Sequence, residues 1–166
     1  MDEVEAAERP SMQEAMRVAF ERHYLSLLKL SVALSGRRDT AEDLVQEAFV
    51  RSAARITQLE PDEVRPYLRR VVVNLWKNRL RRFATEARNS ISLVRPEPES
   101  EAPLEERDLL WRAVMRLPSR QRACLVLRFY EDLPEPEVAR VLGCSVGTVK
   151  SQTSRGLAKL RKGSEA

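Results

Sequence analysis

Two stretches of this 166-residue chain place basic and amide side chains at helical spacing, and such side chains bind nucleic acid. In the first stretch, residues 65–83, the polar side chains of one helical face are those of Arg70, Asn74, Lys77, Asn78 and Arg81. Lysine and arginine hold phosphates, and asparagine both donates to and accepts from a base edge. This stretch therefore predicts a helix that binds nucleic acid through one face.

The second stretch is LPEPEVARVLGCSVGTVKSQTSRGLAKLRK, with a short helix over 135–142, a turn at 143–145 and a basic helix over 146–162. This order is typical of a helix-turn-helix motif, whose second helix enters the major groove. The outward side chains of that second helix are Thr148, Lys150, Ser151, Ser154, Arg155, Lys159 and Lys162, and the inward ones are Val149, Thr153, Leu157 and Leu160. An ordinary amphipathic helix that ends in basic residues is the alternative interpretation.

A third pattern, AEDLVQEAF, is acidic rather than basic. It places Asp43, Gln46, Glu47 and Val50 at helical spacing, so the stripe combines negative charge with an apolar edge. Such a stripe suits a basic protein partner. An exposed acidic face that only aids solubility is the alternative, and the sequence alone favours neither.

The segment QLEPDEVRP contains two prolines and three acidic residues, which favours a loop. Its acidic side chains, Glu60, Asp62 and Glu63, would repel phosphate, but a loop here could hold an unstacked base in a pocket. In the helix that follows, Trp76 and Phe83 lie on an apolar stripe. We expect both rings to pack in the core rather than to stack on bases.

The sequence carries no pattern typical of a catalytic or metal site. It has no paired acid and base, no glycine-rich phosphate loop, and a single histidine, His23. Its two cysteines, Cys124 and Cys144, are expected to pack in the core and in a turn. We therefore expect a protein that is not an enzyme and that uses no cofactor and no metal.

The composition predicts the all-α class, because 5 glycines and 5% aromatic residues argue against sheets and the many Ala, Leu, Arg and Glu residues favour helices. Apolar spacing predicts helices over 11–34, 41–59, 66–83 and 105–116, and a further helix that starts at Pro118-Ser119 and precedes the helix-turn-helix. Gly36 ends the first helix, Thr40 caps the second with Asp43 in the capping-box position, and Ser119 is a further N-cap. Phe129 is expected to point at least partly inward.

Residues 86–104 break the helical pattern with three prolines and several glutamates and serines. We predict a flexible linker there, between one small helical domain over 11–85 and a second over 105–163. Charge is sorted along the chain: residues 65–96 hold nine basic side chains and one acidic, whereas residues 97–108 hold six acidic and one basic. A basic block favours contact with a polyanion, although a solvated helix face would have the same composition.

The N-terminal sequence MDEVEAAERP is acidic and lacks the apolar core of a signal peptide. No apolar run has the length of a membrane span. We expect a soluble cytoplasmic protein without membrane insertion.

The chain resembles a bacterial RNA polymerase sigma factor of the extracytoplasmic-function type, group 4 of the sigma-70 family. The resemblance rests on the stretches DTAEDLVQEAFVRSAARI, RPYLRRVVVNLWKNRLRR and LPSRQRACLVLRFYEDLPEPEVARVLGCSVGTVKSQTSRGLAKLRK, in this order. It implies that the first domain is sigma region 2 and the second is sigma region 4. The implied function is to bind core RNA polymerase and direct transcription initiation, by recognising the −35 and −10 promoter elements and melting the −10 region.

The resemblance also implies roles for particular residues. The coiled coil of the polymerase β′ subunit would be bound by Asp43, Gln46, Glu47 and Val50, while region 4 would sit on the flap of the β subunit. The −10 element would be bound by Arg65, Tyr67, Arg70, Asn74, Lys77, Asn78 and Arg81, with a flipped base held by the loop at 57–65. The −35 element would be read by Thr148, Lys150, Ser151, Ser154, Arg155 and Lys159. An anti-sigma factor is a usual further partner in this family.

The main alternative is a stand-alone helix-turn-helix repressor or activator that binds duplex operators without polymerase. That alternative leaves the asparagine-bearing helix over 65–83 without a role.

Overall fold

The structure is a computed structural model that describes residues 11–89 and 105–164, and these residues form helices without any strand. The predicted all-α class is therefore confirmed. In chain order the elements are α1 (Met12–Ser35), α2 (Arg38–Ile56), α3 (Pro61–Asn89), α4 (Glu105–Met115), α5 (Ser119–Leu125), the π-helical turn η1 (Val126–Tyr130), α6 (Glu135–Leu142) and α7 (Val146–Ser164).

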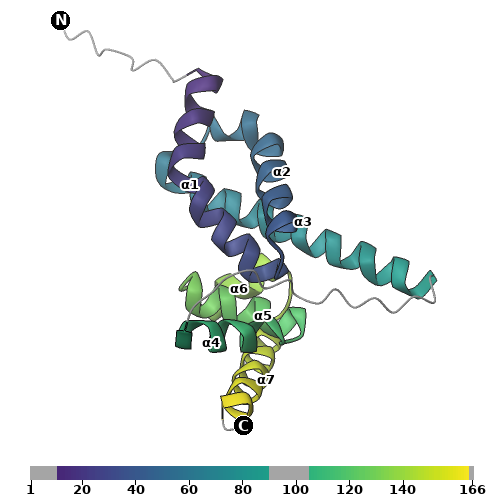
Figure 1. The fold of residues 1–166 in the computed structure, drawn as a ribbon. Helices are drawn as coiled ribbons and strands as arrows, with labels where there is room; N and C mark the ends of the chain where they lie inside the picture. Colours follow the sequence, from purple (N-terminus) through teal and green to yellow (C-terminus); the bar gives the residue numbers. More distant parts are fainter. Residues whose placement is uncertain (1–10, 90–104, 165–166) are drawn as a thin grey trace, which may run out of the picture.

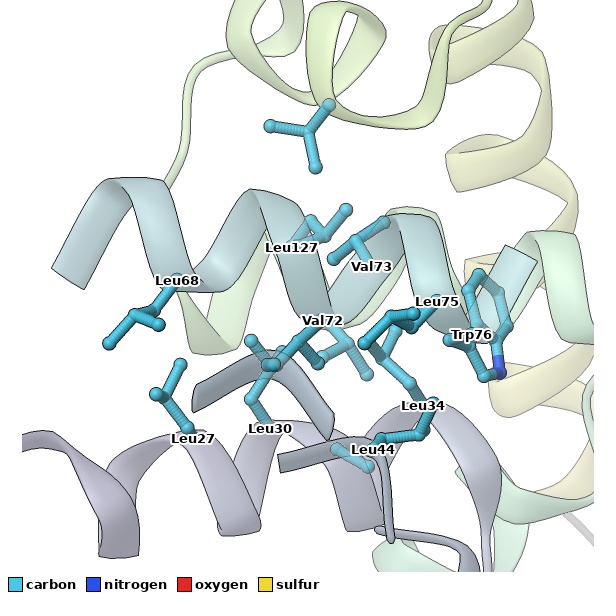
Figure 2. Close-up of a cluster of buried hydrophobic side chains, with 14 of the residues drawn as sticks. Leu27, Leu30, Leu34, Leu44, Leu68, Val72, Val73, Leu75, Trp76 and Leu127 are labelled. Atoms are coloured by element: carbon cyan, nitrogen blue, oxygen red, sulfur yellow. The ribbon is translucent and has the colours of Figure 1, made fainter. Parts of the chain in front are cut away.

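The first three helices pack around leucine and valine side chains. In Figure 1, α1 and α2 lie side by side, and α3 crosses them before its C-terminal half projects from the bundle. The fully buried side chains of this core include Leu27, Leu30, Leu34, Leu44, Leu68 and Val72 (Figure 2). Each such burial stabilises the fold by about 1.5–3 kcal/mol, so this core fixes how α3 crosses the pair.

The two aromatic residues of α3 that were predicted to pack in the core differ in burial. Trp76 is buried, as expected. Phe83 is 56% exposed, so the prediction that it packs in the core is wrong. The physical reason is the length of α3, because Phe83 belongs to the C-terminal half of the helix, and this half projects from the bundle (Figure 1).

Helix α1 ends at the glycine that the sequence predicts, but helix α2 does not begin where the sequence predicts. The Ser11 hydroxyl accepts a hydrogen bond from the Glu14 N–H at 3.2 Å, and Gly36 ends α1 with φ of 76°. The helix α2 begins at Arg38, so the prediction of Thr40 as its N-cap, with Asp43 in a capping box, is wrong. The Asp43 carboxylate instead contacts α3.

Helix α3 begins at Pro61, earlier than its apolar spacing predicts. A proline at the first helical position sacrifices no hydrogen bond, and the Glu63 carboxylate accepts from the Glu60 N–H at 3.0 Å as in a capping box. The expected loop therefore shrinks to residues 57–60. At its other end α3 continues to Asn89, so the first residues of the expected linker are helical, and residues 90–104 lie outside the described part of the chain.

The helices after residue 105 contain one element that the sequence did not predict. Helix α5 begins at Ser119 with Pro118 at the N-cap position, so the cap prediction is wrong by one residue. The π-helical turn η1 then follows, in which the Glu131 N–H donates to the Val126 carbonyl at 3.0 Å. This wider turn changes the angular spacing of the side chains within it. One of them is Phe129, which was expected to point at least partly inward and is 60% exposed.

The helix-turn-helix forms where it was predicted. Helix α6 spans Glu135–Leu142, and Gly143 ends it in the left-handed region with φ of 67°. Helix α7 packs Val149 and Thr153 inward, followed by Gly156. A Cβ at Gly156 would lie 2.9 Å from Leu125 Cδ1, so α5 and α7 approach closely there. Leu157, predicted to be inward, is 38% exposed because Gly156 occupies the contact instead.

The helices before and after the undescribed segment pack against each other. Helix α5 contacts α1, and α6 contacts α3. Leu127 of η1 is fully buried in the same cluster as the side chains of α1 and α3 (Figure 2). The Arg122 guanidinium donates to the carbonyl of Leu34, the last turn of α1, at 2.8 and 3.1 Å. In this structure the two groups of helices therefore share one core.

Candidate nucleic-acid interface

One face of α3 gathers most of the polar residues predicted to bind nucleic acid. Arg70, Asn74, Asn78 and Arg81 are exposed, and Tyr67 is half-buried at the start of the same face. The Arg81 guanidinium donates to the Asn78 amide oxygen at 2.5 Å, which leaves the Asn78 amide nitrogen able to donate to a ligand. The face thus combines cations with amide groups along several turns of a projecting helix.

Lys77 lies at the edge of this face and is half-buried. Burial lowers the pKa of its ammonium group, and the charge of the nearby Arg81 lowers it further. Its side chain lines a cavity of about 590 Å³ between α3 and the helix-turn-helix, with Trp76 and Cys144 among the other lining residues. Lys77 is therefore less freely available to a phosphate than the other cations of the face.

Arg65 does not join this face. Helical geometry places it on the opposite side of α3, where its guanidinium pairs with Glu131 through two contacts of 2.8 Å. Of the residues predicted for one −10 surface, the structure therefore brings six onto or beside one face and separates Arg65 from them.

A cavity of about 550 Å³ opens beside the short loop that joins α2 to α3. The loop residues Thr57, Gln58, Leu59 and Glu60 line one side of it, as expected for a loop that forms a pocket. The opposite wall comes from α1, through Ala15, Val18, Ala19, Arg22 and His23. The cavity lining mixes apolar side chains, such as Val18 and Ile56, with polar ones, such as Arg22 and His23. This mixture is usual for a small-ligand site, and a single base is a ligand of this kind.

His23 is the titratable group that the sequence left unassigned at this cavity. Burial lowers the pKa of its imidazole, and the charges of Arg65 and Arg22 lower it further, so the neutral ring is favoured. A neutral imidazole has one donor and one acceptor nitrogen, which suits a base edge. The sequence offered no sign that His23 lies here, because only the packing of α1 against the α2–α3 loop brings it to the cavity.

Helix α7 presents the second predicted surface. Lys150, Ser151, Ser154, Arg155 and Lys159 are exposed on it, and Thr148 is half-buried at its first turn. The Ser145 hydroxyl accepts from the Thr148 N–H at 3.1 Å and so caps the helix. The Lys150 ammonium lies 3.8 Å from a Glu135 carboxylate oxygen, a loose contact that a phosphate could replace. The structure therefore brings together all the residues predicted for the −35 surface.

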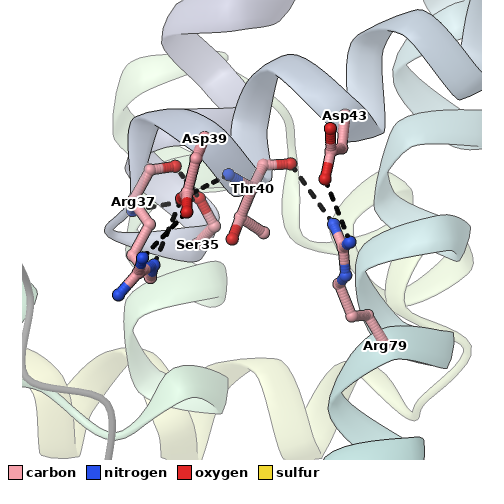
Figure 3. A network of polar contacts seen from close by, with 6 residues as sticks. All are labelled: Ser35, Arg37, Asp39, Thr40, Asp43 and Arg79. Atoms are coloured by element: carbon pink, nitrogen blue, oxygen red, sulfur yellow. Dashed lines mark hydrogen bonds and ion pairs between the residues drawn. The ribbon is translucent and has the colours of Figure 1, made fainter.

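The acidic stripe of α2 is exposed, and both of its carboxylates form ion pairs. Val50 is 77% exposed beside Gln46 and Glu47, an unusual position for a large apolar side chain. The Asp43 carboxylate accepts from Arg79 of α3 at 3.2 Å, and the same guanidinium lies 3.5 Å from the Thr40 carbonyl (Figure 3). Asp43 therefore ties α2 to α3, whereas the Glu47 carboxylate pairs within α2 with the Arg51 guanidinium at 2.5 Å. Both carboxylates keep exposed surface that a partner can reach, and Val50 is the apolar contact beside them.

Two further observations concern the described residues. In residues 11–89 and 105–164, no group of three or more His, Cys, Asp or Glu side chains could hold a metal ion. None of the helices in this part of the chain is long and apolar enough to cross a membrane.

Comparison with known proteins gives two family matches. Residues 19–85 match the Sigma-70 region 2 family, and residues 107–160 match Sigma-70 region 4. The chain is 33% identical over 144 residues to the ECF RNA polymerase sigma factor SigM of Mycobacterium tuberculosis, covering 86% of this chain and 74% of the relative. It is 32% identical over 141 residues to the ECF RNA polymerase sigma factor EcfG of Rhodopseudomonas palustris, covering 81% of this chain and 77% of that protein.

The fold also matches a solved structure. The sigma factor RpoE in its complex with the anti-sigma factor NepR from Bartonella quintana superposes with a TM-score of 0.68. The match covers 90% of this chain and 96% of that one, at 23% sequence identity, and it shows a shared fold.

Proposed function

The chain belongs to the extracytoplasmic-function (ECF) RNA polymerase sigma factors, and on that premise we propose how its surfaces divide the work of promoter recognition. Members of this family are transcription initiation factors that direct RNA polymerase to promoters. The observation that carries the proposal is the pair of exposed polar helix faces, one on α3 and one on α7. The α3 face lies within residues that match Sigma-70 region 2, and the α7 face lies within residues that match Sigma-70 region 4.

Helix α7 reads the −35 element in the major groove of duplex DNA. Its exposed residues Ser151, Ser154 and Arg155 have the reach for base edges, while Lys150 and Lys159 neutralise phosphates. The half-buried Thr148 supports the first turn of the helix through its bond to Ser145. An arginine that makes a bidentate contact with guanine contributes about 1–3 kcal/mol of discrimination, so Arg155 is the residue we expect to matter most.

The polar face of α3 holds the −10 element, and the cavity at the α2–α3 loop receives a base extruded from it. Arg70 and Arg81 bind phosphates, Asn74 and Asn78 bind base edges, and Tyr67 and Lys77 lie at the margins of the same face. Extrusion of one base costs a few kcal/mol, which its contacts in the cavity offset. Neutral His23 and the loop residues around Gln58 supply polar contacts to that base. Binding of the extruded base favours the melted strand.

The exposed stripe of α2 docks on core polymerase. Val50 provides an apolar contact and Glu47 and Gln46 provide polar ones, which suits the basic surface expected of the β′ coiled coil. Helix α7 and its neighbours reach the β flap. The site of action is the cytoplasm, where polymerase and promoter DNA meet.

An anti-sigma factor is a further proposed partner. The related RpoE of Bartonella quintana was solved in complex with NepR, and CnrH, which is 25% identical to this chain, was solved with the cytosolic domain of CnrY. We propose that this chain is also bound by a protein of that kind, which covers its polymerase-binding or DNA-binding surfaces.

The division of roles is tested by variants that separate polymerase binding from promoter use. Glu47→Ala with Val50→Ala is expected to weaken binding to core polymerase, measured by co-elution on gel filtration. Arg155→Ala is expected to leave co-elution unchanged and to reduce promoter-specific transcripts about tenfold, the equivalent of one lost base contact. Glu21→Ala, an exposed acidic position on α1, is the control for the first variant, and Arg112→Ala is the control for the second. Loss of co-elution in Arg155→Ala would refute the assignment.

A further inference from the structure

A buried ion-pair cluster joins α3 to the segment after η1. The Arg65 guanidinium holds both oxygens of the Glu131 carboxylate at 2.8 Å, and its Nε donates to the Ser26 hydroxyl at 3.3 Å. The Arg69 guanidinium adds a contact of 3.4 Å to the same carboxylate. The side chains of Glu131 and Arg69 are only 2% and 9% exposed. Two arginines from one group of helices therefore enclose a single carboxylate from the other.

Arg65 and Arg69 form a site that can bind an anion other than the Glu131 carboxylate. Their positive groups lie close together in a desolvated place, and the Nε of Arg69 is buried with no hydrogen-bond partner. If α5 and η1 moved away from α3, Glu131 would leave, and two adjacent cations would face solvent without it. The forked guanidinium geometry that grips a carboxylate through two oxygens also grips a phosphate through two oxygens.

The position of the cluster indicates which anion could replace Glu131. Val64, one residue before Arg65, lines the cavity at the α2–α3 loop, and the charge of Arg65 reaches His23 on the wall of that cavity. A base held in the cavity carries a phosphodiester on each side within the length of one nucleotide. The anion site thus lies beside the place where a single strand would enter.

We propose that Arg65, Arg69 and Ser26 form a binding site for a phosphodiester of single-stranded DNA. In the closed chain, in which the two groups of helices pack together as in this structure, Glu131 fills this site as an intramolecular substitute for the phosphate. This inference rests on the proposed function, because it takes its ligand from the −10 strand. It adds Arg69 and Ser26 to the nucleic-acid interface and explains why Arg65 lies apart from the polar face of α3. It also makes the closed chain and the strand-bound chain mutually exclusive at this point.

The first test is single-stranded DNA binding by the full chain without polymerase. The probe is a fluorescein-labelled dT12 oligonucleotide, followed by anisotropy at low salt. Glu131→Gln keeps the shape of the side chain but removes its charge, and we expect it to raise the affinity for dT12 about tenfold. In an Arg65→Gln background the same Glu131→Gln change should raise the affinity less than twofold. Glu21→Gln, which removes one exposed acidic charge on α1, is the control and should change the affinity less than twofold.

Two outcomes would overturn the proposal. The first is a Glu131→Gln chain that binds dT12 no more tightly than the unmodified chain. The second is a tenfold gain in dT12 affinity that persists in the Arg65→Gln background. Such a gain would come only from the lost negative charge of Glu131, or only from the separation of the two groups of helices. The dT12 measurements do not involve polymerase. The proposed phosphodiester site can therefore be refuted while promoter-specific transcription by the chain is observed, and the site can be supported while such transcription is absent.

A second measurement serves if Glu131→Gln does not fold, as judged by circular dichroism. Dyes are placed at Ala54→Cys on α2 and Arg116→Cys after α4, two exposed positions, in a chain with Cys124→Ala and Cys144→Ala. Saturating dT12 should lower the energy transfer between the dyes, because the phosphodiester displaces Glu131 and separates the two groups of helices. Bound dT12 with unchanged energy transfer would contradict the proposed competition.

Discussion

Arg122→Ala should destabilise the closed chain more than an ordinary surface substitution. The Arg122 guanidinium is half-buried between the two groups of helices and donates to the Leu34 carbonyl at 2.8 and 3.1 Å and to the Met115 carbonyl at 3.0 Å. Burial lowers the pKa of this group, which means that its charge is held at a desolvation cost. A hydrogen bond from a charged group contributes about 1.5–3 kcal/mol net of its exchange with water. We expect a loss of about 2–3 kcal/mol in the free energy of unfolding, less than three full bonds would give, because two of the bonds share the Leu34 carbonyl.

The assay is urea denaturation followed by tryptophan fluorescence. Trp76 is buried in α3 and lines the cavity against α5, so its emission reports on this contact. Arg116→Ala, an exposed position next to Met115, is the matched control and should stay within about 0.5 kcal/mol of the unmodified chain. A loss below about 0.5 kcal/mol for Arg122→Ala would refute the reasoning, since it would mean that the three bonds add nothing beyond their desolvation cost.

Three further predictions concern single residues. Gly143→Ala should lower the free energy of unfolding by about 1–2 kcal/mol, because its φ of 67° disfavours a Cβ. Gly147→Ala in α7 should not, because a Cβ there would meet only the Ser145 hydroxyl at an ordinary contact distance of 3.8 Å; urea denaturation compares the two variants. Burial raises the pKa of the Cys124 thiol to about 11, so Cys124 should react with iodoacetamide far more slowly than the half-buried Cys144. Mass spectrometry of the labelled peptides measures both rates, and equal rates would show that α5 opens readily. Because burial lowers the pKa of His23, the neutral ring contributes stability above its ordinary pKa of 6.5, and this contribution is lost as the pH falls through the lowered pKa. His23→Gln should therefore reduce the pH dependence of the melting temperature in mildly acid buffer. An unchanged pH dependence would contradict the burial of the ring.

Local patterns predicted the parts of the fold that depend on local chemistry. Gly143 and the helices on either side of it follow from composition and spacing, and the exposed face of α7 follows from its helical periodicity. The start of α3 was placed too late because two prolines suggested a loop, whereas Pro61 at a first helical position and the Glu60–Glu63 contact favour a helix. The π-helical turn η1 was missed because its wider spacing leaves no periodic signal.

The rest could not be predicted because it depends on which helices meet. The family resemblance implies that Arg65 contacts the −10 element, but its pairing with Glu131 joins residues 66 positions apart. His23 and Arg22 reach the loop cavity only because α1 packs beside the α2–α3 connection. Asp43 belonged to an acidic stripe by spacing, but its contact with Arg79 depends on how α3 crosses α2 (Figure 3).

The most direct test of the central claim is run-off transcription with purified core RNA polymerase. The template is a pool of upstream fragments from the genome that encodes the chain, and the 5′ ends of the transcripts are mapped. Transcripts should start at defined sites only when both the chain and the core enzyme are present, and upstream of those sites a −10 and a −35 sequence should recur. Tight binding of duplex DNA by the chain alone, with no start-specific transcript in the presence of core polymerase, would contradict the account.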